Sequence, residues 1–99
     1  FAYLYPSKIK NWENFFTRYY IRIWVKDQPG VLAQIAKILG ENSISISSVI
    51  QKETSEKEEK AEIVILTHKT NENSMQKAIS EIKKLPILEN WGSLIRIEG

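Results

Sequence analysis

The abrupt change of periodicity at Val31 constrains the fold of this chain most. From Tyr19 to Lys26 apolar and polar residues alternate, which is typical of a half-buried β-strand. From Val31 onward the apolar residues are spaced by three and four, which predicts a helix. Four residues suited to a turn separate the two patterns: Asp27, Gln28, Pro29 and Gly30. We therefore expect a strand that feeds directly into a helix through a tight turn.

The start of this helix is a candidate binding site. The first N–H groups of a helix have no partner within it, and the positive end of the helix dipole favours an anion. In the functional interpretation, N–H groups near Val31 and Leu32 bind a carboxylate and Asp27 binds an ammonium group, as a zwitterionic amino acid would require. In the simpler interpretation, Asp27 only caps the helix, while Pro29, in the first helical turn, and Gly30 only serve the turn.

The segments after the turn continue the alternation of strands and helices. The first helix is expected to end at residues 40–43 and to bury a stripe made of Leu32, Ile35, Ala36 and Leu39. A strand follows over Ile44–Gln51, in which Ile44, Ile46 and Ile50 are expected to face away from Ser45, Ser47 and Val49.

The second half of the chain predicts two further strands and one helix. Ile63–Leu66 is apolar on both faces, so this strand should be central. A helix over Asn71–Lys84, capped by Asn71 or Asn73 and stopped by Pro86, buries Met75, Ala78, Ile79 and Ile82. The last segment, Ile87–Glu98, is a strand with an irregularity at Gly92.

The resulting order, β-α-β-β-α-β, predicts an α+β fold of the ferredoxin-like class. Such a fold has a four-stranded antiparallel sheet with two helices on one face. Residues 1–18 are interpreted as a lead-in from a missing upstream domain, and residues 19–99 as the folded domain. The charged run at residues 52–60 is expected to form a solvated hairpin loop.

Composition argues for a binding module rather than an enzyme. The chain has no cysteine and one histidine, His68, so it offers neither a thiol nucleophile nor the ligand spacing of a metal site. We expect no catalytic residue and no metal. Fourteen basic and twelve acidic residues give a net charge of +2, which favours neither nucleic acid nor a membrane surface as partner. No apolar run approaches the length of a membrane span, and a cytoplasmic location is expected.

The stretch VKDQPGVLAQIAKILGENSISISSVIQ, which follows Tyr19 and Tyr20, resembles an ACT domain, a small regulatory amino-acid-binding module of biosynthetic enzymes. Within that family it is most similar to the C-terminal domains of homoserine dehydrogenases. Three more stretches support this resemblance, which covers residues 18–99: Arg18-Tyr19-Tyr20, Ile65-Leu66-Thr67-His68 and Leu94-Ile95-Arg96-Ile97-Glu98.

The resemblance implies a homodimer that pairs through its second strand and first helix. The effector would lie between the strand-helix turn of one copy and the second strand of the other. For homoserine dehydrogenases the expected effector is L-threonine, and the expected partner is an upstream dehydrogenase domain that carries the NAD(P) cofactor, with no cofactor in this segment. The implied effector-binding residues are Asp27 for the amino group, Gln28, Pro29, Gly30, Val31 and Leu32 around the turn, and Ser45 and Ile46 on the partner strand.

Two departures from the family pattern are visible. Ser43 stands where relatives often have glycine before the second strand, so we expect Asn42 to adopt any left-handed conformation. Ser45 stands where serine-binding relatives carry asparagine. Two other functions remain open: an ACT domain that only dimerises, and a single-stranded RNA-binding domain that stacks bases on Tyr20 and Trp24. The absence of an aromatic pair in the third strand argues against the RNA-binding function.

Overall fold

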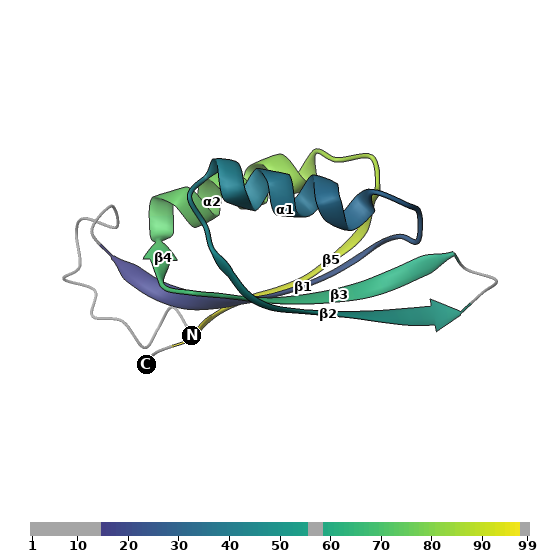
Figure 1. The fold of residues 1–99 in the computed structure, drawn as a ribbon, viewed down its shortest axis with the longest axis horizontal. Helices are drawn as coiled ribbons and strands as arrows, with labels where there is room; N and C mark the ends of the chain where they lie inside the picture. The colour runs from purple at the N-terminus through teal and green to yellow at the C-terminus, as the bar shows by residue number, and fades with distance from the viewer. Residues whose placement is uncertain (1–14, 56–58, 98–99) are drawn as a thin grey trace.

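The computed structural model describes residues 15–55 and 59–97. In this part of the chain, two helices lie on one face of a twisted antiparallel sheet (Figure 1). The elements in chain order are β1 (Phe16–Lys26), α1 (Val31–Glu41), β2 (Ile46–Ser55), β3 (Lys60–Thr67), β4 (Thr70–Asn71), α2 (Glu72–Lys83) and β5 (Leu88–Ile97).

The sheet has the strand order β2-β3-β1-β5, and the two-residue β4 pairs with the start of β1. All of these pairings are antiparallel. The predicted ferredoxin-like α+β fold is thereby confirmed, as is the central position of β3. Only β4 was not predicted, because a strand of two residues is too short to show periodicity.

The core lies between the sheet and the helices. The predicted inward face of β1 is confirmed, since each of its four members is at most 1% exposed: Tyr19, Ile21, Ile23 and Val25. The predicted stripe of α2 is also buried, and the Asn71 side chain caps this helix by accepting hydrogen bonds from two N–H groups, those of Asn73 (2.8 Å) and Ser74 (3.3 Å). β1 begins at Phe16, three residues before the predicted strand.

The predicted stripe of α1 is partly wrong. The buried side chains of this helix are Val31, Ile35 and Leu39, whereas Leu32 is 36% exposed. Successive helical residues are rotated by about 100°, so the stripe that starts at Val31 turns Leu32 towards the edge of the sheet. Pro29 lies in the turn before the helix rather than in its first turn.

The predicted faces of β2 are wrong beyond Ile46, because the strand contains a β-bulge. Ile46 pairs with Thr67 and Ser48 pairs with Leu66, so two steps along β2 match one step along β3. The extra residue exchanges the two faces of the strand. Val49 therefore packs on the core, while Ile50 points to the other face and is 50% exposed.

Two backbone irregularities border the other elements. Ser43, at φ 61°, adopts the left-handed conformation after α1, whereas Asn42 has φ −98°. The expectation for Asn42 was wrong, because its amide instead bonds the Ile38 carbonyl (2.8 Å) as a helix C-cap. The predicted irregularity at Gly92 is confirmed as a bulge between the β5 residues that pair with Arg22 and Ile23.

Some predictions fall outside the described residues. Most of the predicted lead-in, including Trp12, lies within residues 1–14, which are outside the described ranges. Residues 56–58 of the charged run are outside them as well. On its described side, β2 continues to Ser55 and pairs there with Lys60, so much of the predicted loop is strand.

Candidate functional site

A pocket of about 240 Å³ lies where the turn after β1 meets the start of α1. Apolar side chains from three elements form part of its wall: Val25 of β1, Val31 of α1 and Ile63 of β3. Polar residues complete it, namely Lys26, Gln28 and Gln51, together with Gly30, Leu32 and Ala33 at the helix start. A water occupies roughly 30 Å³ in the liquid, so this volume is about that of eight water molecules.

The backbone at the helix start provides donors to this pocket. Gly30 has φ 83° and occupies the N-cap position, and no side chain caps the helix. The Val31 N–H reaches the Gln28 carbonyl (3.3 Å), but within the described residues the N–H groups of Leu32 and Ala33 have no acceptor. These two donors, at the positive end of the helix dipole, favour a bound anion.

The structure brings together half of the predicted site residues. Gln28, Gly30, Val31 and Leu32 line the pocket. Asp27 and Pro29 belong to the same turn but are exposed beside the pocket rather than lining it. Asp27 does not cap the helix, which excludes the simpler interpretation of this residue, and its carboxylate has no hydrogen-bond partner in the described ranges.

Ser45 and Ile46 lie elsewhere in the same copy, at the beginning of β2. They follow the C-terminal end of α1, and this helix of 11 residues is about 16 Å long. Ser45 is exposed, and its carbonyl accepts a hydrogen bond from the His68 N–H (2.9 Å). These two residues therefore do not line the pocket of their own chain. Their role on a partner strand stays a prediction.

The sequence prediction missed Lys26 and Gln51 as pocket residues. Lys26 ends β1, so its strand position was foreseen but not its place beside the helix start. The prediction placed Gln51 at the end of the second strand without assigning it to a face. Extending the alternation before the bulge would have placed it on the wrong one. Cross-strand pairing with Ile63, which is 1% exposed in the core, shows that Gln51 lies on the helix-covered face.

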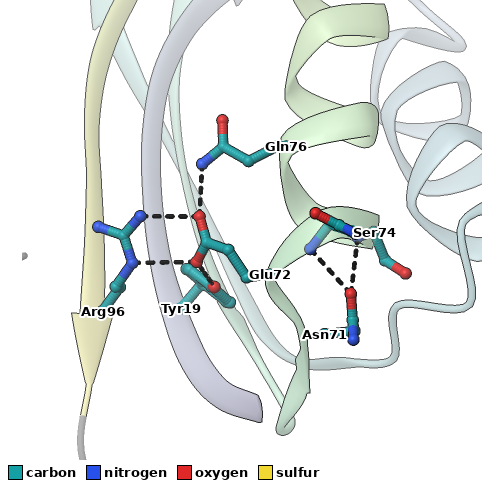
Figure 2. Close-up of polar contacts among 7 residues, drawn as sticks. Tyr19, Asn71, Glu72, Ser74, Gln76 and Arg96 are labelled. Carbon is teal, nitrogen blue, oxygen red and sulfur yellow. Dashed lines mark hydrogen bonds and ion pairs between the residues drawn. The ribbon is translucent and has the colours of Figure 1, made fainter. Parts of the chain in front are cut away.

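A second polar cluster is buried at the opposite end of the sheet (Figure 2). Glu72, at the start of α2, is 5% exposed and accepts hydrogen bonds from three side chains. Arg96 approaches both carboxylate oxygens (Nε–Oε1 3.0 Å, Nη2–Oε2 2.7 Å), Gln76 donates to Oε2 (2.7 Å), and the Tyr19 hydroxyl donates to Oε1. This cluster joins α2 to β1 and β5.

The contacts in this cluster shift three pKa values. Burial alone would raise the pKa of Glu72, but hydrogen bonds from Arg96, Tyr19 and Gln76 lower it below its ordinary value. Burial and the neighbouring carboxylate raise the pKa of Tyr19. The hydrogen bond to Glu72 raises the pKa of Arg96 despite partial burial. The cluster is therefore a satisfied ion pair with a structural role.

The sheet face without α1 and α2 carries Tyr20, Arg22 and Trp24 of β1. Arg22 stacks on the Trp24 ring at 4.8 Å and forms an ion pair with Glu62 of β3. None of the remaining outward residues of β3 is aromatic: Lys60, Val64 and Leu66. The described part of this face thus lacks the second aromatic strand that base stacking would use.

The described ranges hold neither a metal-ligand cluster nor a membrane-spanning helix. There, no three His, Asp or Glu side chains are placed to hold a metal ion. Neither α1 nor α2 combines the length and hydrophobicity that a membrane-spanning helix needs. His68 is exposed at the end of β3.

Comparison with known proteins places this geometry in a family. The sequence profile of the ACT domain matches residues 19–87. The homoserine dehydrogenase of Methylobacillus glycogenes is 46% identical over 80 residues, which are 81% of this chain and 19% of that protein. The homoserine dehydrogenase of Neisseria gonorrhoeae is 44% identical over 81 residues, covering 82% of this chain and 18% of that protein.

A solved structure agrees with these sequence relatives. The homoserine dehydrogenase of Thiobacillus denitrificans superposes with a TM-score of 0.77 at 38% identity, over 88% of this chain and 19% of that one. The chain therefore spans about a fifth of the length of these relatives.

Proposed function

Because this chain belongs to the ACT-domain family, we propose that it is the regulatory domain of a homoserine dehydrogenase and binds L-threonine as a feedback inhibitor. The reaction would take place in an upstream dehydrogenase domain that holds NAD(P). This chain would contribute no catalytic residue. Its role would be to bind the effector in a homodimer and to bias the attached domain.

The pocket at the start of α1 is the observation that carries this proposal. Its two unbonded N–H groups and the nearby Lys26 suit the carboxylate of a free amino acid. Asp27, exposed in the same turn and without a partner among the described residues, suits the ammonium group. A pocket of about 240 Å³ has room for a free amino acid as small as L-threonine.

The edge of the sheet supports the homodimer. β2 is an edge strand in the described sheet, and its outward side chains include the half-exposed Ile50. An edge strand offers unpaired backbone groups to another strand, and two copies related by a two-fold axis would pair their β2 strands antiparallel. Such pairing brings Ser45 and Ile46 at the start of one β2 towards Gln51 further along the other, and so towards the pocket.

Feedback would follow from linkage between effector binding and the dimer arrangement. Threonine that binds one arrangement more tightly shifts the population towards it, and a coupling of about 1–3 kcal/mol is enough for regulation. Binding across two copies makes the site sensitive to how those copies are arranged. The proposed inhibition therefore needs no contact between threonine and the catalytic residues.

Isothermal titration of the 99-residue chain with L-threonine tests the proposal, with L-lysine and L-methionine as comparison ligands. We expect saturable heat for threonine and much weaker binding of the other two. Asp27→Ala should abolish binding and leave the fold and dimer intact, whereas Glu41→Ala, the same change at the far end of α1, should have no effect. Unchanged affinity in Asp27→Ala would show that the ammonium group is bound elsewhere.

The dimerisation-only function gives a different result in the same experiment. In that case no amino acid produces heat at millimolar concentration, while sedimentation still shows a dimer. A monomer that binds no amino acid would contradict both functions.

A further inference from the structure

The sheet face opposite α1 and α2, here called the outer face, is unusually apolar for a face in water (Figure 1). An antiparallel sheet with one solvated face normally alternates apolar residues inward with polar residues outward. Here the strands beside β1 carry apolar residues outward as well: Val64 and Leu66 of β3, Ile95 and Ile97 of β5, and Ile50 of β2. Ile50 is 50% exposed. A contiguous apolar surface of this kind indicates a site of interaction.

β1 adds a row of aromatic and cationic side chains along the middle of the outer face. Residues two apart on a strand point to the same side. The row therefore runs in the order Phe16, Arg18, Tyr20, Arg22 and Trp24. Tryptophan, tyrosine and arginine are the side chains that most often dominate the binding energy of a protein interface. The row thus has the composition of an interface centre.

Trp24 and Arg22 are already held in position. Gly92 of β5 makes room for the Trp24 ring, since a Cβ atom at Gly92 would lie 2.8 Å from that ring. The Arg22 guanidinium stacks on the ring at 4.8 Å and pairs with Glu62 of β3. Side chains that are fixed before binding lose little conformational entropy when a partner binds. The pair is therefore preorganised as an anchor.

The charge of the outer face discriminates between possible occupants. Among the described residues, the register places the cations Arg18, Arg22, Lys52 and Lys60 on it, with Glu62 as the carboxylate. Two copies that met through this face would bring like charges together, which disfavours a second copy as occupant. A surface that carries carboxylates among apolar side chains is complementary.

We propose that the outer face docks an acidic, partly apolar surface of the domain that precedes this chain in the same polypeptide. This inference rests on the proposed function for the identity of that domain as a dehydrogenase, and it adds where the domain is held. The row begins at Phe16, the first residue of β1, so a domain attached ahead of β1 is tethered at the end of this face. Phe16 itself is 59% exposed. A tether raises the effective concentration to the millimolar range, so a modest interface is sufficient.

Carbodiimide cross-linking of the full-length dehydrogenase, mapped by mass spectrometry, tests the proposal. The reagent joins an amine to a carboxylate that contacts it directly, so it reports both the contact and its charge. We expect Lys52, which is exposed, to be joined to carboxylates of the dehydrogenase domain. Lys77 is exposed on α2, on the opposite side of the sheet, and should give no such product.

Two substitutions should weaken the docking in different ways. Trp24→Ala removes the aromatic anchor, and Arg22→Ala removes the cation stacked on it. Each should lower the yield of the Lys52 product by about fivefold or more. Lys37→Ala, which removes an exposed cation from α1, is the matched control for Arg22→Ala and should leave the yield unchanged. Circular dichroism establishes which variants keep the fold, and if one of the two unfolds, the other decides.

The outcomes separate this proposal from the proposed function. A Lys52 product with the dehydrogenase domain that falls in the folded variants supports the docking. No such product, a product with a second copy of this chain alone, or an unchanged yield in a folded variant overturns it. Isothermal titration of the 99-residue chain tests threonine binding independently, and Trp24→Ala should bind threonine as the unmodified chain does. Cross-links to the dehydrogenase domain without threonine binding would overturn the effector role and leave the docking standing.

Discussion

The hydroxyl of Tyr19 donates a hydrogen bond to the carboxylate of Glu72, which lies 53 positions further along the chain. Tyr19 is fully buried in β1, and Glu72 begins α2, so this contact links an inner strand of the sheet to the second helix. It also leaves the buried carboxylate bonded by a neutral donor in addition to Arg96. Stability, acid sensitivity and the position of α2 should therefore depend on this pair.

Tyr19→Phe should destabilise the fold by about 1.5–3 kcal/mol, because it removes a hydrogen bond to a buried charged group. Urea unfolding followed by circular dichroism measures the change. Tyr20→Phe is the matched control: Tyr20 lies on the other face of the same strand, and its loss of a hydroxyl should cost much less. Equal costs for the two variants would contradict a special role for the buried pair.

Replacing Glu72 should change how stability depends on pH. The folded-state pKa of Glu72 is lowered from 4.5. The ionised Glu72 therefore contributes fully to the free energy of unfolding above that value, and this contribution is lost as the pH falls through the folded pKa. The pKa of Tyr19 is raised from 10.0. The neutral Tyr19 therefore contributes fully to the free energy of unfolding below that value, and this contribution is lost as the pH rises through the folded pKa.

Glu72→Gln should lower stability near neutral pH and flatten the loss of stability below about pH 4.5. Urea unfolding between about pH 3 and pH 7 measures both effects. Glu81 is exposed on the same helix. Glu81→Gln should therefore lose stability at acid pH as steeply as the unmodified protein does. If Glu72→Gln loses stability at acid pH as steeply as the unmodified chain, other carboxylates are responsible for the acid sensitivity.

Gly92→Ala should be strongly unfavourable, because a Cβ atom there would lie 2.4 Å from the Arg22 carbonyl oxygen and 2.8 Å from the Trp24 ring. We expect a loss of about 1–3 kcal/mol, typical of overpacking. Gly40→Ala should have the opposite effect. Apart from the neighbouring residues and backbone of its own helix, no described atom lies within 4 Å of the added group, and alanine favours a helix by about 0.8–1 kcal/mol over glycine. Thermal unfolding should therefore shift in opposite directions for the two variants.

Ser43→Gly should stabilise the chain by about 1 kcal/mol, because Ser43 adopts a left-handed conformation that glycine reaches without a steric penalty. The same substitution at Ser45, which has no positive φ, should be neutral or destabilising. Urea midpoints compare the two variants. A loss of stability in Ser43→Gly would mean that the added freedom of the unfolded glycine outweighs the relief of strain.

Local patterns predicted most of the fold because each depends on neighbours along the chain. The alternation of β1, the helix start at Val31 and the stripe of α2 follow from spacing alone. The irregularity at Gly92 followed from a glycine within a strand pattern. For the site, spacing located the turn and four of the residues that line the pocket.

What the sequence did not reveal depends on contacts between distant segments. One extra residue in β2 exchanges its faces, and nothing in the alternation of Ile46, Ile50 and Gln51 marks where the insertion falls. The cluster around Glu72 joins residues 53 and 24 positions apart, so no local motif announces it. The sequence also predicted the wrong residue, Asn42 rather than Ser43, as left-handed, because the bond from the Asn42 amide to the Ile38 carbonyl is not visible in the sequence.

The short pairing of β4 with Phe16 and Thr17 has a mechanical consequence. Along its length β1 is hydrogen bonded to β3 and β5, and at its first residues it is bonded to β4 as well. A force applied at Phe16 along β1 would be resisted by hydrogen bonds to three neighbouring strands, which load in shear. We therefore expect such a force to move the sheet as a unit rather than to separate one strand from its edge.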